Sequence, residues 1–504
     1  MKGAGGTAVS TCLKNNNYFT MKIGLLEFNE SIWPSLERTR AFYLDTITKR
    51  FDTCAVTTSN NGEINVTPDA IVNFMGNAGW ELTTHPDCPL IFGIHGGTIL
   101  NQAFLRTHLG KLRPSDMLIV NCQSDIDILN SMFADNAPTL CHLPLPVDDT
   151  CFRPMSKQQV RKQLGLQEDD VVVGFVSRLL PQKNLHRYLD LLVQLKKQLF
   201  PRKVKGIVIG KYWIDYPVLD YQTGNYPNYI QQLIEKLGLK NDLLYFPANL
   251  SNDDLATCYN AMDLFIHPTN SIDENFGYAP VEAMACGTPV LGAAYGGLKD
   301  TVISGTTGFL MPTWVTDAGI RMDTFAAMQF ATGLLTDKAL KESMSAAALR
   351  HAAGYSRETC ADILCTAITK AVEGYNEDVP AINASLLPVP AISSQEEYLP
   401  EIDIPWKYYK EQVRYYVSNA DNKPDEETLV YTSVPVVQLS ADRVQLDDPA
   451  WPAVYPTDAL TQTIISYCQT PIKIKTLLDS CDTDLPRITV LINAGLLSYS
   501  HEKV

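Results

Sequence analysis

Two glutamates in the middle of the chain have the residue type and spacing to hold a polyhydroxyl ligand. Glu274 lies in a polar loop, and Glu282 follows eight residues later in a helix predicted over residues 279–286. An ionised carboxylate accepts hydrogen bonds at two oxygens and suits a vicinal diol, so the pair could bind hydroxyl groups at the two ends of one ligand. The alternative is structural: a solvated loop charge and a charge stabilised by the helix dipole.

Two cations occupy a second loop with chemical potential. Arg178 and Lys183 follow a continuous β-branched run at residues 171–176 and precede an amphipathic helix that begins at Leu185. Cations in such a strand-to-helix loop can converge on one polyanion, whereas on a plain surface they are usually solvated. Backbone N–H groups at the start of the helix after Gly277 could hold a phosphate as well.

These loops need strands and helices to position them, and the chain alternates the two from Met21 onward. Buried strands are predicted at residues 23–28, 54–58, 70–74, 89–94 and 117–121, with an amphipathic helix at 36–51. Such alternation indicates a parallel sheet, whose ligands gather at the carboxyl ends of the strands. His95 lies at one of these ends. A histidine that forms hydrogen bonds within a local turn is the alternative.

The run Glu274-Asn-Phe-Gly-Tyr-Ala-Pro-Val-Glu282, followed by Ala-Met-Ala-Cys-Gly-Thr-Pro-Val and a Gly-Gly turn, resembles the E-x7-E motif of retaining glycosyltransferases of family 4. The resemblance extends over about residues 21–376. It implies the α/β GT-B fold, in which two Rossmann-like domains face a cleft. A metal-independent reaction is also expected, because a basic pair can replace a metal and no Asp-x-Asp lies in a suitable loop.

The resemblance also assigns roles to individual residues. Arg178 and Lys183 would bind the donor diphosphate and stabilise the charge on the leaving phosphate. Glu282 would hold the ribose diol, and Glu274 the sugar hydroxyls together with the backbone of the next three residues. His95 would approach the sugar from the opposite domain. The site residues expected from sequence are Arg178, Lys183, Glu274 and His95 for catalysis, and Glu282, Asn275, Phe276, Gly277, Gly174 and Asn249 for the donor.

Two segments separate this chain from the family pattern. A glycine-rich loop often follows the first strand in the family, where acceptor or phosphate approaches; here residues 29–35 read Asn-Glu-Ser-Ile-Trp-Pro-Ser. An acceptor therefore cannot be transferred from better-known relatives. Residues 211–229 hold five tyrosines and a tryptophan. They predict either a sugar-facing surface or an insertion packed on the second domain, and the insertion is favoured.

Composition limits the class of protein. The 504 residues are 45% hydrophobic and 19% charged, as in a water-soluble protein of several domains. A net charge of −15 argues against a nucleic-acid partner. The sequence has no apolar run of transmembrane length and no signal-peptide core, and its 12 cysteines are scattered, which together favour a cytoplasmic protein with reduced thiols.

The expected domain order is a flexible extension at 1–20, an acceptor domain at 21–155, a donor domain at 156–376, a linker at 377–398 and an accessory module at 399–504. The helix at 357–374 should cross back to the first domain. Three helical patterns that begin at Asp458, Ile472 and Leu485 predict a small, mainly helical, winged-helix-like module. Because acidic residues outnumber basic ones about two to one from Gln395 onward, a protein partner or homo-oligomer is favoured over DNA.

The sequence thus predicts a retaining glycosyltransferase with front-face chemistry, no cofactor and no metal. Its donor would be a nucleotide-diphosphate sugar, with a UDP-sugar favoured, and its acceptor a glycan, a lipid-linked molecule or a small molecule. Two alternatives remain open: a non-catalytic GT-B protein that binds a sugar nucleotide, and a glycoside phosphorylase of the same architecture.

Overall fold

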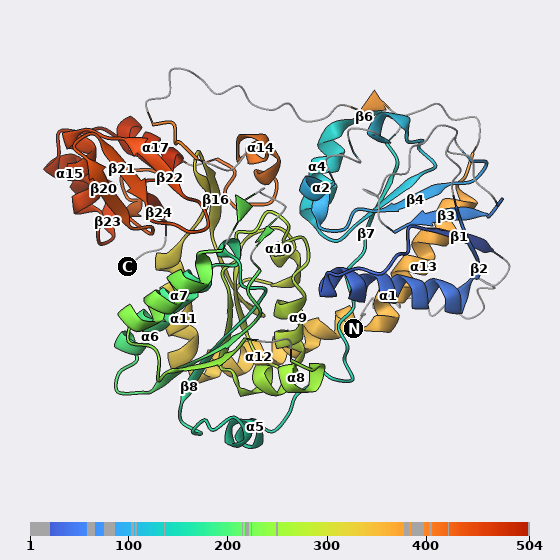
Figure 1. The fold of residues 1–504 in the computed structure, drawn as a ribbon, viewed down its shortest axis with the longest axis horizontal. Helices are drawn as coiled ribbons and strands as arrows, with labels where there is room; N and C mark the ends of the chain where they lie inside the picture. The colour runs from blue at the N-terminus through green and yellow to red at the C-terminus, as the bar shows by residue number, and fades with distance from the viewer. Residues whose placement is uncertain are drawn as a thin grey trace, which may run out of the picture.

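The chain forms two parallel sheets side by side, with a third unit packed on one of them (Figure 1). The computed structural model describes residues 21–57, 66–74, 86–101, 105, 108–135, 137–213, 215–216, 221–222, 224–247, 250–376, 383–384, 398–402, 406–421 and 423–501. The expected extension at 1–20 lies outside these residues. So does the predicted linker at 377–398, apart from residues 383–384 and 398.

The first sheet has six parallel strands in the order β2-β1-β3-β4-β5-β7. Its strands are fully apolar where they are central, which is typical of a sheet covered on both faces. Helix α1 begins at Pro34, whose ring suits the first helical turn. The elements are β1 (Lys22–Leu26), α1 (Pro34–Arg50), β2 (Asp52–Ala55), β3 (Ala70–Asn73), β4 (Leu90–Gly93), α2 (Gly97–Leu100), η2 (Leu109–Lys111), β5 (Met117–Val120), α4 (Gln123–Met132), β6 (Phe133–Asp135) and β7 (Thr139–His142).

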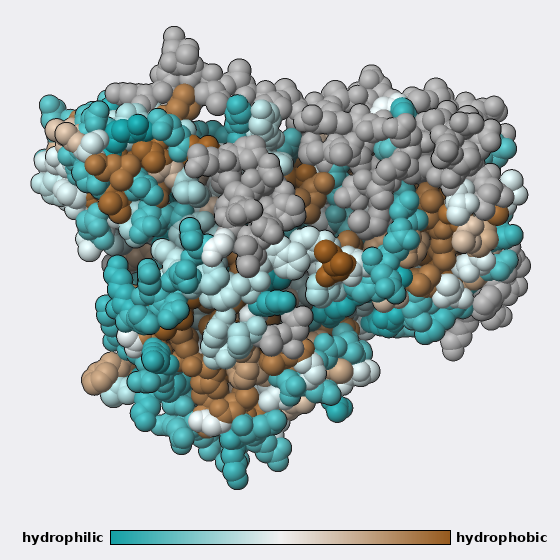
Figure 2. Space-filling model, in the orientation of Figure 1, coloured by the Kyte–Doolittle hydropathy of each residue, from teal (hydrophilic) through white to brown (hydrophobic). Residues whose placement is uncertain are grey.

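The second sheet also has six parallel strands, in the order β12-β9-β8-β13-β14-β15. Its amphipathic helix α6 buries a leucine-rich face, and hydrophilic side chains cover the outer side that α6 and α7 present in Figure 2. The elements are α5 (Lys157–Gln163), β8 (Val171–Val176), η3 (Pro181–Lys183), α6 (Leu185–Gln198), β9 (Val204–Ile209), β10 (Asp215–Tyr216), β11 (Tyr221–Gln222), α7 (Tyr226–Lys236), β12 (Leu243–Phe246), α8 (Asn252–Ala261), β13 (Leu264–His267), α9 (Tyr278–Ala285), β14 (Val290–Ala293), α10 (Leu298–Thr301), β15 (Gly308–Met311), β16 (Thr313–Thr316), β17 (Gly319–Met322), α11 (Thr324–Thr336) and α12 (Lys338–Ala352).

Helix α13 (Arg357–Glu373) returns to the first domain, as predicted (Figure 1). Its apolar face, which includes Leu364 and Ile368, shares a core with Ile23, Phe42 and other residues of β1 and α1. The helix is preceded by the short turn η4 (Ala353–Tyr355), whose Tyr355 carbonyl accepts a 2.9 Å hydrogen bond from Val147. The chain thus enters the second domain after β7 and returns to the first domain through η4 and α13.

The C-terminal module is mixed, so the prediction of a mainly helical unit was wrong. The three predicted helices are present, but two three-stranded antiparallel sheets accompany them, β23-β19-β24 and β20-β21-β22. The elements are η5 (Trp406–Tyr408), α14 (Lys410–Val413), β19 (Leu429–Tyr431), β20 (Val436–Ser440), β21 (Arg443–Leu446), β22 (Ala453–Pro456), α15 (Ala459–Tyr467), β23 (Ile472–Lys473), α16 (Ile474–Ser480), α17 (Leu485–Ala494) and β24 (Ser498–Ser500), with β18 (Asn383–Ala384) paired to β6. The sequence did not predict these sheets because their strands are short and are separated by Pro and Asp residues.

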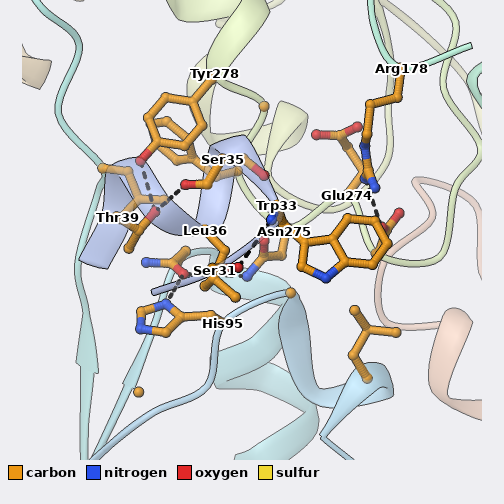
Figure 3. Close-up of a pocket in the computed structure, with 18 of the residues that line it drawn as sticks. Ser31, Trp33, Ser35, Leu36, Thr39, His95, Arg178, Glu274, Asn275 and Tyr278 are labelled. Atoms are coloured by element: carbon orange, nitrogen blue, oxygen red, sulfur yellow. Dashed lines mark hydrogen bonds and ion pairs between the residues drawn. The ribbon is translucent and has the colours of Figure 1, made fainter. Parts of the chain in front are cut away.

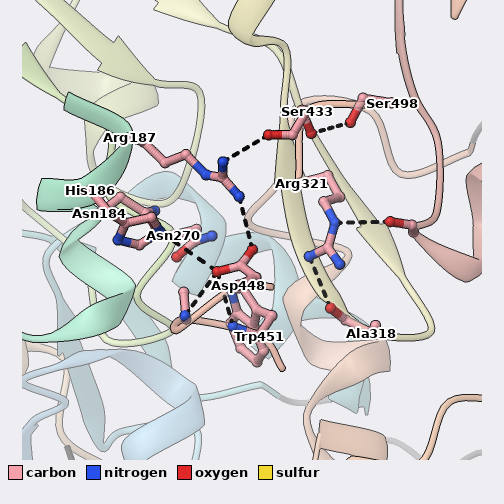
Figure 4. A network of polar contacts seen from close by, with 12 residues as sticks. Asn184, His186, Arg187, Asn270, Ala318, Arg321, Ser433, Asp448, Trp451 and Ser498 are labelled. Carbon is pink, nitrogen blue, oxygen red and sulfur yellow. Dashed lines mark hydrogen bonds and ion pairs between the residues drawn. The ribbon is translucent and has the colours of Figure 1, made fainter. Parts of the chain in front are cut away.

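A buried ionic network fastens this module to the second domain (Figure 4). Asp448 lies 3.4 Å from the guanidinium of Arg187 on α6, and Arg187 also donates to the Ser433 carbonyl at 2.7 Å. Burial raises the pKa of Asp448, but Arg187, His186 and Arg321 together outweigh that effect and leave the pKa well below the usual range. The carboxylate therefore stays charged, and the module is an integral part of the core of the second domain.

Among the described residues, no helix is both long and apolar enough to cross a membrane. All the cysteines among them are unpaired.

Candidate functional site

A cavity of about 920 Å³ lies between the two sheets and receives residues from all three parts of the chain. The first domain contributes the loop at residues 29–36 and the loop that carries His95. The second domain contributes Arg178, Lys183 and the loop at residues 273–279, and the C-terminal module contributes Tyr409. The carboxyl ends of β8 and β13 feed these loops, as expected for parallel sheets.

The two predicted cations meet two carboxylates in this cavity (Figure 3). Lys183 ends the short helix η3, and its Nζ lies 2.6 Å from Glu274 Oε2 and 3.6 Å from Asp273 Oδ1. The Arg178 guanidinium lies 3.2 Å from Asp273 Oδ2. The predicted convergence of Arg178, Lys183 and Glu274 is therefore present, whereas Asp273 was missed although it directly precedes Glu274.

Both carboxylates are held in the ionised form. Burial raises the pKa of Glu274, but Lys183 and His267 outweigh that effect and lower the pKa far below its ordinary value. Asp273 behaves in the same way, with burial opposed by Lys183 and Arg178. An ionised Glu274 accepts hydrogen bonds and has no proton to give, so it suits sugar hydroxyls and cannot serve as a general acid.

A pair of glycines fixes the backbone of the glutamate loop. Gly297 N–H donates to the Glu274 carbonyl at 3.1 Å. A Cβ on Gly296 would lie 2.0 Å from that carbonyl oxygen, and one on Gly297 would lie 2.4 Å from the backbone of Asn275. Gly277, with φ of +85°, then turns the chain into α9. The Gly-Gly turn noted in the sequence thus packs directly against the backbone of the glutamate loop, where a side chain would not fit.

His95 lies on the opposite wall, at the carboxyl end of β4 (Figure 3). Its Nδ1 is 3.4 Å from Asn121 Oδ1, and the Asn275 amide of the second domain is 3.4 Å from the same oxygen. Burial lowers the pKa of His95 to about 4, so the ring is neutral at pH 7. A neutral imidazole is suited to a hydrogen bond with a hydroxyl group rather than to binding a phosphate.

Glu282 does not line the cavity. It is buried on α9, where it lies 2.7 Å from Arg38 Nη1 and accepts a 3.1 Å hydrogen bond from the Tyr259 hydroxyl. Arg38 belongs to α1 of the first domain and stacks over the Tyr278 ring. In this structure α9 turns Glu282 toward the other domain, where Arg38 balances its charge, and its contact with the donor ribose stays a prediction.

The remaining predicted residues divide into three groups. Asn275, Phe276 and Gly277 line the cavity beside Glu274. Gly174 does not: it lies inside β8, where a Cβ would come within 2.0 Å of the Met262 sulfur, so it serves strand packing and its prediction as a donor contact is corrected. Asn249 lies outside the described residues.

The sequence analysis missed two other wall residues, Trp33 and Tyr409. Trp33 stacks on Trp213 with ring centroids 4.5 Å apart, and the Arg178 guanidinium lies 5.2 Å from the Trp33 ring. The aromatic segment after β9 is thus in part packed against the first domain. Tyr409 comes from the C-terminal module. The bulky residues of the loop at 29–35 could have indicated a wall position for Trp33. No local sequence pattern predicts that Tyr409 reaches this cavity.

Two parallel sheets with a cavity between them are the arrangement of a GT-B fold. A family model described as Glycosyl transferases group 1 matches residues 156–321, which hold Arg178, Lys183 and Glu274. The second domain is thus similar to this family, and the resemblance to family 4 glycosyltransferases is confirmed.

Curated relatives and solved structures agree with this assignment. The chain is 34% identical over 314 residues to a D-inositol 3-phosphate glycosyltransferase of Mycobacterium marinum, covering 59% of this chain and 62% of the relative. A protein of the same name from Mycobacteroides abscessus is 31% identical over 312 residues, or 60% of this chain and 65% of the relative. The chain thus spans less than two thirds of the length of these relatives.

The fold is similar to that of solved structures. Sucrose-phosphate synthase from Thermosynechococcus elongatus matches with a TM-score of 0.54 and 18% identity, over 70% of this chain and 100% of that structure. Anabaena HepE, solved with UDP-glucose, matches with a TM-score of 0.50 and 20% identity, over 70% and 100%. The predicted GT-B architecture is confirmed.

Proposed function

We propose that the chain is a retaining glycosyltransferase that moves a sugar from a nucleotide-diphosphate sugar to an acceptor hydroxyl. The observation that carries the proposal is the approach of Lys183 and Arg178 to Glu274 and Asp273 in one cavity between the domains. Cations bind a diphosphate, and an ionised glutamate binds sugar hydroxyls. The names of the curated relatives support the same activity.

The side chains suggest how the reaction proceeds. The diphosphate would take over Arg178 and Lys183 from their carboxylate partners, and the two cations would stabilise the charge that develops on the leaving phosphate. Glu274 would then be free to accept hydrogen bonds from the sugar. Because Lys183 and His267 engage this carboxylate, we favour a front-face reaction in which the leaving phosphate takes the acceptor proton. We also propose that no metal takes part, since the two cations can replace one.

Donor binding and turnover test the proposal. A thermal-shift screen with UDP, GDP, ADP and TDP, with and without EDTA, identifies the base; UDP is the first choice because HepE was solved with UDP-glucose. A nucleotide at about 100 times its dissociation constant should stabilise the fold by about 2.7 kcal/mol. Hydrolysis of the matching sugar nucleotide, followed by NMR, then reports turnover and the anomeric configuration. Stabilisation without hydrolysis would instead favour a sugar-nucleotide-binding protein, and phosphate-dependent turnover without a nucleotide would favour a phosphorylase.

Lys183→Ala gives the decisive variant. We expect the rate to fall about 100- to 1000-fold, because one contact to the charge on the leaving group is lost. Lys205→Ala is the matched control, since Lys205 also forms an ion pair, 2.9 Å from Asp242, but does not line the cavity. Equal rates for the two variants would refute the phosphate role of Lys183.

A further inference from the structure

The wall that the first domain contributes to the cavity carries only negative formal charge among the described residues. Glu27 and Glu30 line it, and none of the described lining residues of this domain is Lys or Arg. Besides the neutral ring of His95, its other polar groups include amides and hydroxyls, which donate to and accept from neutral ligands: Asn29, Ser31, Ser35, Thr39, Asn101 and Asn121.

The nearest arginines of α1 are engaged elsewhere. Arg38 forms its ion pair with Glu282 at 2.7 Å. Arg40 donates to Glu37 at 2.8 Å and to the Phe28 carbonyl at 3.2 Å. Neither residue lines the cavity. An anionic group at this wall would have no arginine of α1 to meet.

The charge of the whole cavity points the same way. Its cations are Arg178 and Lys183, and its carboxylates are Glu27, Glu30, Asp273 and Glu274, so carboxylates outnumber cations four to two among the described lining residues. A donor diphosphate would bring further negative charge to the same two cations. A second phosphate, on the acceptor, would then enter a field of its own sign.

The loop after β1 strengthens this selectivity. Trp33 fills the side of the loop nearest Arg178, where its indole lies 5.2 Å from the guanidinium. Glu27 holds a left-handed backbone conformation with φ of +58°, and its carboxylate accepts a 3.1 Å hydrogen bond from Asn29. This uncommon backbone conformation sets the direction in which the Glu27 side chain leaves the wall, and the hydrogen bond from Asn29 favours one position of its carboxylate.

We propose that the acceptor is an uncharged, hydroxyl-rich molecule, a sugar or polyol without phosphate, whose hydroxyl groups donate to Glu27 and Glu30. This inference rests on the proposed transfer reaction. In that reaction the acceptor oxygen bonds to the anomeric carbon while the bond from that carbon to the donor phosphate oxygen breaks. The acceptor proton passes to the departing phosphate oxygen, so no external base is needed.

Matched acceptor pairs test the proposal. Release of nucleotide from the donor identified by the thermal-shift screen is measured with myo-inositol against D-inositol 3-phosphate, and with glucose against glucose 6-phosphate, each at 10 mM, roughly an upper working concentration for a weak acceptor. We expect the acceptor-dependent rate to be at least about tenfold higher for the neutral member. A higher rate for the phosphorylated member, or equal rates within both pairs, overturns the inference.

A charge reversal on the exposed loop adds a second readout. Glu30→Lys should raise the rate with the phosphorylated acceptor. The ratio of the rate with the neutral acceptor to the rate with the phosphorylated acceptor should then fall at least about threefold, and Glu30→Gln should lower this ratio less. An unchanged ratio in Glu30→Lys counts against the inference. Donor hydrolysis without acceptor is recorded throughout. If hydrolysis occurs and phosphorylated acceptors are preferred, the acceptor inference alone fails; if the protein neither binds nor hydrolyses any donor, the proposed function fails and takes the inference with it.

Discussion

Each glutamate of the E-x7-E motif is held by a different cation. Lys183 binds Glu274 inside the cavity, whereas Arg38 binds Glu282 at the contact between α1 and α9. A donor that binds both carboxylates would have to displace Lys183 from Glu274 and Arg38 from Glu282. For Lys183 the exchange is favourable, because the diphosphate replaces the carboxylate as its partner. For Arg38 it is a competition between the guanidinium and the ribose.

Arg38→Ala tests this competition. If the ribose of the donor binds Glu282, removal of the guanidinium should tighten nucleotide binding about fivefold, equivalent to roughly 1 kcal/mol for a partly exposed ion pair. Isothermal titration with the nucleotide measures the change. Arg50→Ala is the control, because Arg50 lies on the same helix and forms ion pairs with Glu358 and Asp362 on α13. Weaker binding in Arg38→Ala would mean that the ion pair supports the donor site instead.

At the residue scale, the sequence predicted which side chains supply the chemistry of the cavity better than it predicted the residues with which they pair. Arg178, Lys183 and Glu274 could be predicted because each follows a strong strand pattern, and strand ends of a parallel sheet converge. The direction of Glu282 could not, since it depends on how α1 of the first domain meets α9. Residue pairs far apart in sequence leave no local pattern.

At the element scale, two glycines support the backbone of the loop between β13 and α9, besides the side-chain contacts of Glu274 with Lys183 and His267. Gly296 and Gly297 come so near the loop backbone that any side chain would displace it. Composition alone predicted this strand-loop-helix unit and the helices after it, because the periodic and breaker signals are strong. The short strands of the C-terminal module gave no comparable signal, and the antiparallel pairing of β19 with β24 joins residues as far apart in sequence as Leu429 and Ser500.

Gly296→Ala tests the support for the glutamate loop. The new Cβ would meet the Glu274 carbonyl at 2.0 Å, so the loop has to shift, and a displacement of about 1 Å in a positioned group can cost about 100-fold in rate. Gly305→Ala is the matched control: Gly305 also has a positive φ, of +78°, but a Cβ there meets nothing within 4 Å. Both variants should lose roughly 1 kcal/mol of unfolding free energy.

Steady-state rates and chemical unfolding of the two variants separate the effects. Strain alone would lower stability in both and leave the rates equal. That result would contradict the role of the glycine pair in positioning Glu274.

At the scale of the whole molecule, a segment of the C-terminal module connects the two domains. The Tyr416 hydroxyl donates to Asp125 of the first domain and accepts a 3.2 Å hydrogen bond from the Thr98 N–H. Its carbonyl accepts from Gly296 N–H of the second domain at 2.9 Å. One residue therefore touches both the helix that follows His95 and the turn that supports Glu274, so the module takes part in shaping the cavity besides any partner it binds.

Tyr416→Phe removes the link to the first domain and keeps the aromatic ring. We expect the unfolding free energy to fall by roughly 1 kcal/mol for one buried hydrogen bond, and the transfer rate to fall about tenfold because the His95 wall is less firmly positioned against the donor. Tyr455→Phe is the matched control, since the Tyr455 hydroxyl is also buried but donates to the Ala494 carbonyl within the module. It should lose similar stability and keep the rate. If the two variants retain the same rate, the module stabilises the chain without setting the geometry of the cavity; if only Tyr416→Phe is slow, the hydroxyl contributes to catalysis from a residue 95 positions beyond residue 321, where the match to the family model ends.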